Sequence, residues 1–212
     1  MHNPYAVVDE LETAISEYTA APYVVTTNSC TMALLLSCLY LLKAMKESSD
    51  KRIEIPKRTY VSVPMSIIHA GGRPVFRDQD WLGYYQLKPL PVLDCARWFS
   101  SGMYRHGLNG ENFGGSMVCI SFHASKILGD TQGGAILLDD EKAYEWLLKA
   151  RFDGRTKGVP PHRDTFDTIG WHCYMSPDVA ARLMLKLSIL PFNNIPLPND
   201  NYPDLSKMEI FK

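Results

Sequence analysis

The stretch RIEIPKRTYVSVPMSIIHAGGRPVFRD, residues 52–78, decides the expected fold. RIEIP alternates between polar and apolar residues as a strand does, VSVPMSIIHAGG has the composition of a helix that closes on glycines, and PVFRD again has strand character. A strand, a helix and a strand joined by short connections are typical of an α/β layer whose sheet is mainly parallel.

The alternation continues on both sides of this unit. Before it, the sequence predicts helices over residues 5–18 and 31–46, with the strand YVVTT at 23–27 between them. After it, the pattern predicts strands at 90–95, 116–122 and 133–139 and helices at 140–152 and 176–189. We therefore expect one α/β domain over residues 1–190.

Two segments lack a regular pattern. Residues 100–115, SSGMYRHGLNGENFGG, are rich in glycine but do not have the glycine spacing of a phosphate-binding loop, so a mobile connection is expected. The C-terminal tail, residues 191–212, begins with the proline-rich run PFNNIPLPNDNYPDL. Prolines at this density exclude a long helix or a central strand.

The composition excludes several classes of partner. Lys and Arg number 22 and Asp and Glu number 23, so we expect no nucleic acid and no anionic membrane to be bound through bulk charge, and a small-molecule partner is favoured. Five scattered cysteines indicate ordinary buried thiols in a reducing compartment, not a disulfide framework or a zinc site. The start of the chain carries acids where a signal peptide has basic residues, and no apolar run reaches the roughly 18 residues of a membrane span. We expect a soluble cytoplasmic protein.

Polar residues follow several predicted strands, where ligands collect in an open α/β sheet. After YVVTT, Cys30 and Thr31 open a helix whose free N–H groups favour an anion such as phosphate, although a plain helix cap also explains them. Asp94 ends an apolar strand and needs a cation, which is either Arg97 or a protonated ligand nitrogen. Tyr60 follows RIEIP and either stacks on a flat ring or lies in the core.

A lysine occupies an unusual place in CISFHASKILGDTQGGAILLDD, residues 119–140. Small and apolar residues surround Lys126, and Ser121 lies five positions before it. Burial lowers the pKa of a lysine, and the neutral amine can form a Schiff base; the alternative is a side chain that extends to the surface. Together, an anion site, a carboxylate, an aromatic face and a nucleophilic lysine are what pyridoxal 5′-phosphate (PLP) requires.

Several segments resemble, in the same order, those of the DegT/StrS-type sugar aminotransferases, which are PLP-dependent enzymes of fold type I. NSCTMALLLSCL is similar to the family's S-G-T-A-A-L segment, PVLDCARWF to P-V-I-E-D-A-A-Q, and the lysine segment to F-S-F-H-x-x-K-x-L-x-x-G-E-G-G. IPKRTYVSVPMSIIHAGGRPVFRD and DTIGWHCYMSPDVAARLMLKL resemble two further family segments. The resemblance covers about residues 5–190 and implies a three-layer large domain that binds PLP.

The resemblance implies a role for each candidate residue. Lys126 would carry PLP as a Schiff base and then move a proton, which is general acid–base work. Asp94 would keep the pyridine nitrogen protonated, and Tyr60 would stack on the ring. The phosphate would be held by the backbone N–H of Cys30, which stands where the family has glycine, by Thr31 and by Ser121.

The resemblance also implies a homodimer with shared active sites. His172 or Tyr174 of one chain would reach the phosphate bound by its partner, and His172 stands where the family has asparagine. Arg97 stands where the family has a glutamine beside the cofactor's phenolic oxygen.

Two parts of the family pattern are reduced in this sequence. Between Asp78 and Pro91 the family has a complete strand and helix, and the C-terminal small domain is largely missing. The expected function is transfer of an amino group from a donor such as glutamate to a keto compound such as a nucleotide-linked keto sugar. Two alternatives stay open: a non-catalytic or assembly protein that retains the fold, or another PLP reaction such as elimination or dehydration. Lys126 argues against the dehydratase branch of the family, which has histidine at this position.

Overall fold

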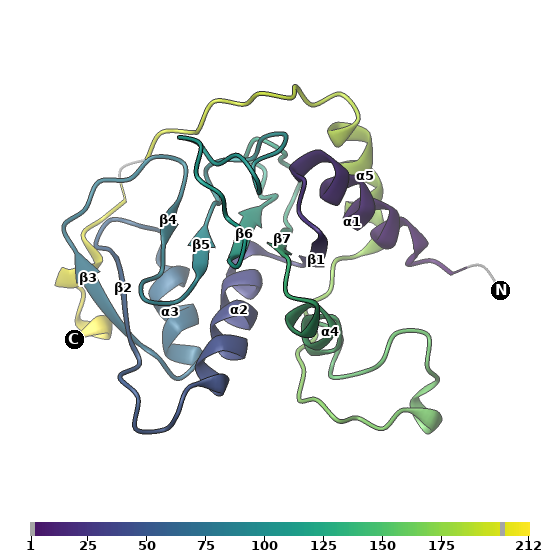
Figure 1. Cartoon of the computed structure of the whole chain (residues 1–212), viewed down its shortest axis with the longest axis horizontal. Helices are drawn as coiled ribbons and strands as arrows, with labels where there is room; N and C mark the ends of the chain where they lie inside the picture. Colours follow the sequence, from purple (N-terminus) through teal and green to yellow (C-terminus); the bar gives the residue numbers. More distant parts are fainter. Residues whose placement is uncertain (1–2, 200–201) are drawn as a thin grey trace.

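Seven strands lie within the residues that the computed structural model describes, 3–199 and 202–212, and they form two sheets (Figure 1). The larger sheet has the order β1 (Tyr23–Thr27), β7 (Gly134–Leu138), β6 (Met117–Ser121), β5 (Val92–Asp94) and β4 (Tyr85–Gln86). The smaller sheet pairs β2 (Arg52–Pro56) with β3 (Arg73–Arg77).

Most strands run in one direction. β5 and β6 are parallel, and β1 has the same direction because β7 pairs antiparallel with both β1 and β6. β2 and β3 are parallel to each other, and an antiparallel bridge between Glu54 and Lys88 joins β2 to the residues after β4. β4 and β7 are the reversed strands. The predicted α/β fold with a mostly parallel sheet is confirmed.

Helices cover both faces of the larger sheet. One face carries α1 (Ala6–Thr19) and α5 (Pro177–Leu187), which lie side by side in Figure 1. The other face carries α2 (Cys30–Ala44), α3 (Ser62–His69) and α4 (Glu141–Ala150). Sheet and helices therefore make the three layers that the family resemblance implied.

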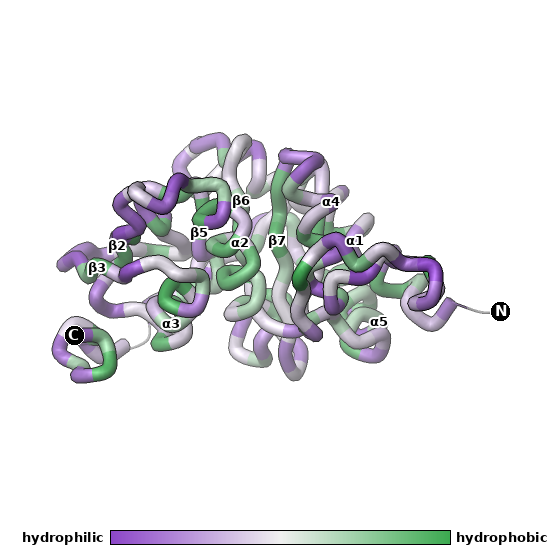
Figure 2. Tube along the Cα trace, turned by 90° about the horizontal axis from the view of Figure 1, so that it is seen from below, coloured by the Kyte–Doolittle hydropathy of each residue, from purple (hydrophilic) through white to green (hydrophobic). Residues whose placement is uncertain are grey.

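The strands supply a hydrophobic core to each face by simple alternation. In β6, Val118 and Ile120 belong to the core under α1 and α5, whereas Met117 and Cys119 belong to the core under the other helices. All five residues of β7 are buried, and the strand is coloured as hydrophobic along its length in Figure 2. A strand buried on both faces needs no polar alternation, which is why its sequence is continuously apolar.

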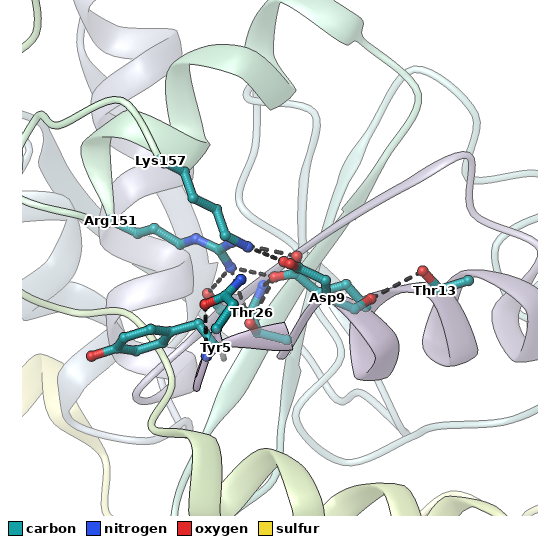
Figure 3. Close-up of polar contacts among 8 residues, drawn as sticks. Tyr5, Asp9, Thr13, Thr26, Arg151 and Lys157 are labelled. Atoms are coloured by element: carbon teal, nitrogen blue, oxygen red, sulfur yellow. Dashed lines mark hydrogen bonds and ion pairs between the residues drawn. The ribbon is translucent and has the colours of Figure 1, made fainter. Parts of the chain in front are cut away.

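A buried ion pair joins three elements near the N-terminus. The guanidinium of Arg151, at the end of α4, contacts the carboxylate of Glu12 on α1 and donates a hydrogen bond of 2.7 Å to the carbonyl oxygen of Thr26 on β1 (Figure 3). The same carboxylate accepts bonds from the backbone N–H and the hydroxyl of Thr26, at 2.8 and 2.7 Å. All polar groups in this cluster are thus paired inside the core.

Replacing Arg151 with alanine is expected to lower the free energy of unfolding by about 3–5 kcal/mol, because Glu12 would remain buried without a cation. Urea unfolding followed by circular dichroism measures this change. The matched control is Lys157→Ala, since Lys157 forms a half-exposed ion pair with Asp9 in the same region and should contribute no more than about 1 kcal/mol (Figure 3). Equal losses for the two variants would contradict the assignment of a buried pair.

The proline-rich tail is packed along the body of the protein. The carbonyl oxygen of Phe192 accepts a bond from the backbone N–H of Ser101 at 2.8 Å, and the N–H of Leu197 donates to the carbonyl of Arg97 at 2.8 Å. Further on, the N–H of Leu205 donates to the carbonyl oxygen of Lys57 at 2.9 Å, and the Leu205 side chain is fully buried. In Figure 1 the tail passes from α5 to the neighbourhood of β3. Among residues 3–199 and 202–212, no helix combines the length and the apolar character that crossing a membrane requires.

Candidate active site

A cavity of about 360 Å³ opens at the carboxyl ends of β1, β2, β5 and β6. This size falls within the range of small-molecule sites, and the position is the one at which open α/β sheets bind ligands. The structure brings together seven of the nine candidate residues in its wall: Cys30, Thr31, Tyr60, Asp94, Arg97, Ser121 and Lys126.

Lys126 lies on a loop that is fixed at both ends. Its backbone N–H donates to the carbonyl of His123 at 2.9 Å, and Asp130 donates its N–H to the carbonyl of Phe122 at 2.8 Å. The buried Asp130 carboxylate accepts bonds from Arg182 at 2.9 Å and Lys186 at 2.7 Å, both on α5. These bonds hold the pKa of Asp130 well below its usual range. The loop is therefore clamped to a helix, which fixes the backbone of Lys126 beside the cavity that its half-buried side chain lines.

Asp94 is the buried carboxylate of the cavity, with 4% of its surface exposed. Its Oδ1 accepts a bond from the N–H of Ala96 at 3.0 Å, and its Oδ2 accepts one from the hydroxyl of Tyr85 at 2.7 Å. Burial raises the pKa of Asp94, while these two bonds and the positive charge of Lys126 oppose the rise. Arg97 was one of the two partners considered for Asp94, but its guanidinium donates to the carbonyl of Pro198 in the tail.

The N-terminus of α2 forms another wall. Ser29 caps the helix by accepting a bond from the N–H of Met32 at 3.2 Å, and the Thr31 hydroxyl lies 2.8 Å from that of Ser62. A side chain at Gly134 would come within 2.5 Å of the Cys30 nitrogen, so the helix start rests directly on the backbone of β7. Burial raises the pKa of the Cys30 thiol well above its usual value and keeps it neutral. The helix start thus offers N–H groups and hydroxyls to an anion, without a competing thiolate.

Aromatic side chains close the remaining side. Tyr60 lines the cavity at 57% exposure, so it does not lie in the core. Trp81 and Tyr202 also line the cavity, and their rings are inclined by only 14° with centroids 6.4 Å apart. The amide of Asn199 donates to the carbonyl of Trp81 at 2.7 Å, which ties the tail to this wall.

Sequence reasoning missed Trp81, Tyr85 and Tyr202. The first two come from WLGYY, residues 81–85, in the segment expected to be shortened, and this density of aromatic residues was a usable signal. Tyr202 had no such signal, because its position depends on the path of the tail.

His172 and Tyr174 lie outside this cavity. His172 Nδ1 is 2.9 Å from Asp153 Oδ2, and the Tyr174 ring packs edge-on against Phe152 at 4.9 Å. Tyr174 borders a separate cavity of about 470 Å³ together with Tyr5. The expectation that these residues reach a partner's phosphate stays a prediction.

The chain belongs to the DegT/DnrJ/EryC1/StrS aminotransferase family, whose model matches residues 1–92 and 90–194. The two matched parts overlap at residues 90–92.

Individual relatives are distant. The spore coat polysaccharide biosynthesis protein SpsC of Bacillus subtilis (strain 168) is 24% identical, with 72% of this chain and 47% of the relative covered. The solved structure of Helicobacter pylori PseC, an aminotransferase involved in the biosynthesis of pseudoaminic acid, is 18% identical with a TM-score of 0.71 and covers 91% of this chain and 59% of that chain. Bacillus subtilis NtdA with bound cofactor PMP is 17% identical with a TM-score of 0.67, over 87% of this chain and 48% of that chain. The chain spans about half the length of these relatives, and the likeness to the solved structures is one of fold.

Proposed function

We propose that the protein is a PLP-dependent aminotransferase that moves an amino group from an amino acid such as glutamate to a keto compound, and that its acceptor is a nucleotide-linked keto sugar. The observation that carries the proposal is the presence of Lys126, Asp94 and the start of α2 in the wall of one cavity. The family supports the reaction class, and the biosynthetic roles in the names of SpsC and PseC support a sugar acceptor.

The residues present fit PLP. The donor set of the cavity comprises an amine at Lys126, a buried carboxylate at Asp94 and a helix N-terminus with hydroxyl groups at Thr31 and Ser62. These groups match, in that order, an aldehyde, a protonated ring nitrogen and a phosphate. Tyr60 offers an exposed ring face for stacking.

PLP supplies an electron sink that stabilises negative charge on the donor's α carbon. Lys126 Nζ would hold the cofactor at its aldehyde carbon, and as a free amine it would accept the proton from the donor's α carbon. Asp94 would hold a proton on the ring nitrogen through its ionised Oδ atoms. The N–H of Cys30 and the hydroxyls of Thr31 and Ser121 would orient the phosphate, and Arg97 would lie beside the phenolic oxygen.

The proposal includes a homodimer in the cytoplasm. In it, His172 or Tyr174 of each chain would contact the phosphate held by the other. The family supports the dimer, and the five unpaired cysteines support a reducing compartment such as the cytoplasm.

A spectroscopic titration tests the proposed function. The purified protein mixed with PLP should turn yellow, and glutamate should convert the colour to that of the pyridoxamine form, which a keto sugar nucleotide should then reverse. A protein that stays colourless with PLP contradicts the proposal. Colour that no amino donor changes would instead support a non-catalytic protein that retains the fold.

The tail is expected to contribute to substrate binding through Tyr202. Truncating this ring, Tyr202→Ala, should raise KM for the keto acceptor about tenfold with kcat nearly unchanged, because an aromatic contact contributes about 0.5–1.5 kcal/mol and is made before and during the reaction. Steady-state kinetics measure the changes in KM and kcat separately. The matched control is Phe192→Ala, an exposed aromatic residue of the tail at 75% exposure that does not line the cavity. A KM change equal to that of the control would refute the assignment.

A further inference from the structure

Tyr85 occupies a position that suits it to act on Asp94. It lies in β4, the two-residue strand within the shortened segment, and pairs directly across the sheet with Asp94 of β5. Side chains of directly opposed residues in an antiparallel pair lie on the same face. The Tyr85 ring is 97% buried, with 3% of its surface exposed, and its hydroxyl is 2.7 Å from Asp94 Oδ2.

The direction of the hydrogen bonds follows from the number of protons. Tyr85 has one hydroxyl proton and donates it to Asp94, so the contact of 2.5 Å with the Thr59 hydroxyl must have Thr59 as donor. Thr59 is itself buried at 1% exposure. Burial and the nearby charge of Asp94 raise the pKa of Tyr85 well above its usual value, so the phenol remains a donor. A chain of bonds from Thr59 through Tyr85 therefore ends on the carboxylate.

Asp94 needs such a donor because burial disfavours its ionised form. The groups that act on it come from five places: Tyr85 on β4, Cys95 and the N–H of Ala96 just after β5, Lys126 on the loop after β6, Cys30 on α2 and Cys119 on β6. Burial raises the pKa of the three thiols, which keeps them neutral near pH 7. Tyr85, the N–H of Ala96 and Lys126 are then the groups that favour the carboxylate.

We propose that Tyr85 is a positioning residue that keeps Asp94 ionised and fixes its Oδ2, so that the carboxylate is ready to hold a protonated ring nitrogen. This inference rests on the proposed function for the identity of the ligand. Tyr85 belongs to the shortened segment between Asp78 and Pro91. The proposal therefore gives this segment a part in the site, because it supplies the buried hydroxyl that donates to Asp94.

The first test uses the protein without cofactor. Infrared difference spectra recorded over a pH series follow the protonated carboxyl band of Asp94, which is identified by its loss in Asp94→Asn. In Tyr85→Phe the midpoint of this band should move upward by about one pH unit, because a bond that favours the charged form is lost. The matched control is Tyr84→Phe. Tyr84 also donates to a carboxylate, that of Glu111 at 2.8 Å, but it packs against the core under α1 and α5, on the other face of the sheet. A midpoint that Tyr85→Phe leaves at the wild-type value overturns the proposal.

The second test uses two ligands. Tyr85→Phe should weaken binding of pyridoxamine phosphate about tenfold and leave binding of a carbocyclic analogue without the ring nitrogen unchanged, as measured by tryptophan fluorescence. Equal weakening of both ligands would contradict a role through Asp94. If neither ligand binds wild-type protein, the proposed function fails, whereas the infrared midpoint still decides the effect of Tyr85 on Asp94.

Discussion

Lys126→Ala is expected to lower the rate of amino transfer by at least about 10³-fold, because it removes the nucleophile and a general acid–base whose role alone contributes about 10²–10⁴-fold. The loop itself should stay in place, since its anchor is the bond of Asp130 to Arg182 and Lys186. Single-turnover measurement with glutamate checks this expectation.

Two companion variants separate charge from nucleophilicity. Lys126→Arg keeps a positive charge but cannot supply a neutral amine, so it should be as inactive as the alanine variant. Lys142→Ala removes an exposed lysine at the start of α4 and should leave the rate unchanged. Substantial activity in Lys126→Arg would show that the charge, and not the amine, is what the site requires.

Asp94→Asn is expected to reduce the rate by about 10²–10³-fold, the usual effect of removing one fixed electrostatic partner from a reacting centre. Asparagine keeps the shape of the side chain but has a single oxygen, which can accept the bond from Tyr85 or the one from the N–H of Ala96. The loss therefore reflects the negative charge together with one hydrogen bond. Rates measured at saturating PLP and glutamate test this prediction.

The same variant should not destabilise the protein without cofactor. Burial places the pKa of Asp94 in the folded state above its unfolded value of about 3.9, so the folded state binds the proton more tightly. The contribution of Asp94 to stability therefore falls as pH rises from the unfolded to the folded pKa. At pH 7 Asp94→Asn should have a Tm equal to or above that of wild type, and a large drop in Tm would mean that the activity loss reflects unfolding.

Local patterns in the sequence were sufficient for most of the fold. The apolar spacing of residues 5–18 became α1, and the strand at 52–56 became β2 with the same ends. The helix and strand that follow became α3 and β3 with ends shifted by one to three residues. These elements depend on contacts near in sequence or on the burial of one face, both of which composition records. The residues after the predicted strands lie in one cavity because the carboxyl ends of parallel strands meet at the same edge of the sheet.

Features that depend on distant contacts were not predictable. The wall formed by Trp81 and the tail joins residues 118 positions apart at Asn199, and no local pattern encodes that meeting. The glycine-rich residues 100–115 were expected to be a mobile connection, yet Met103 and Tyr104 are fully buried. Their glycines allow sharp turns, at Gly102 for example with φ of +66°, while the intervening apolar side chains reach the core.

The central claim is that the Lys126 amine binds the aldehyde of PLP. Treating the PLP-loaded protein with borohydride, which makes the linkage permanent, and mapping the modified peptide by mass spectrometry tests it most directly. The account predicts one pyridoxyl group per chain, on Lys126. Modification of a different lysine, or none at all while PLP stays bound, would contradict it.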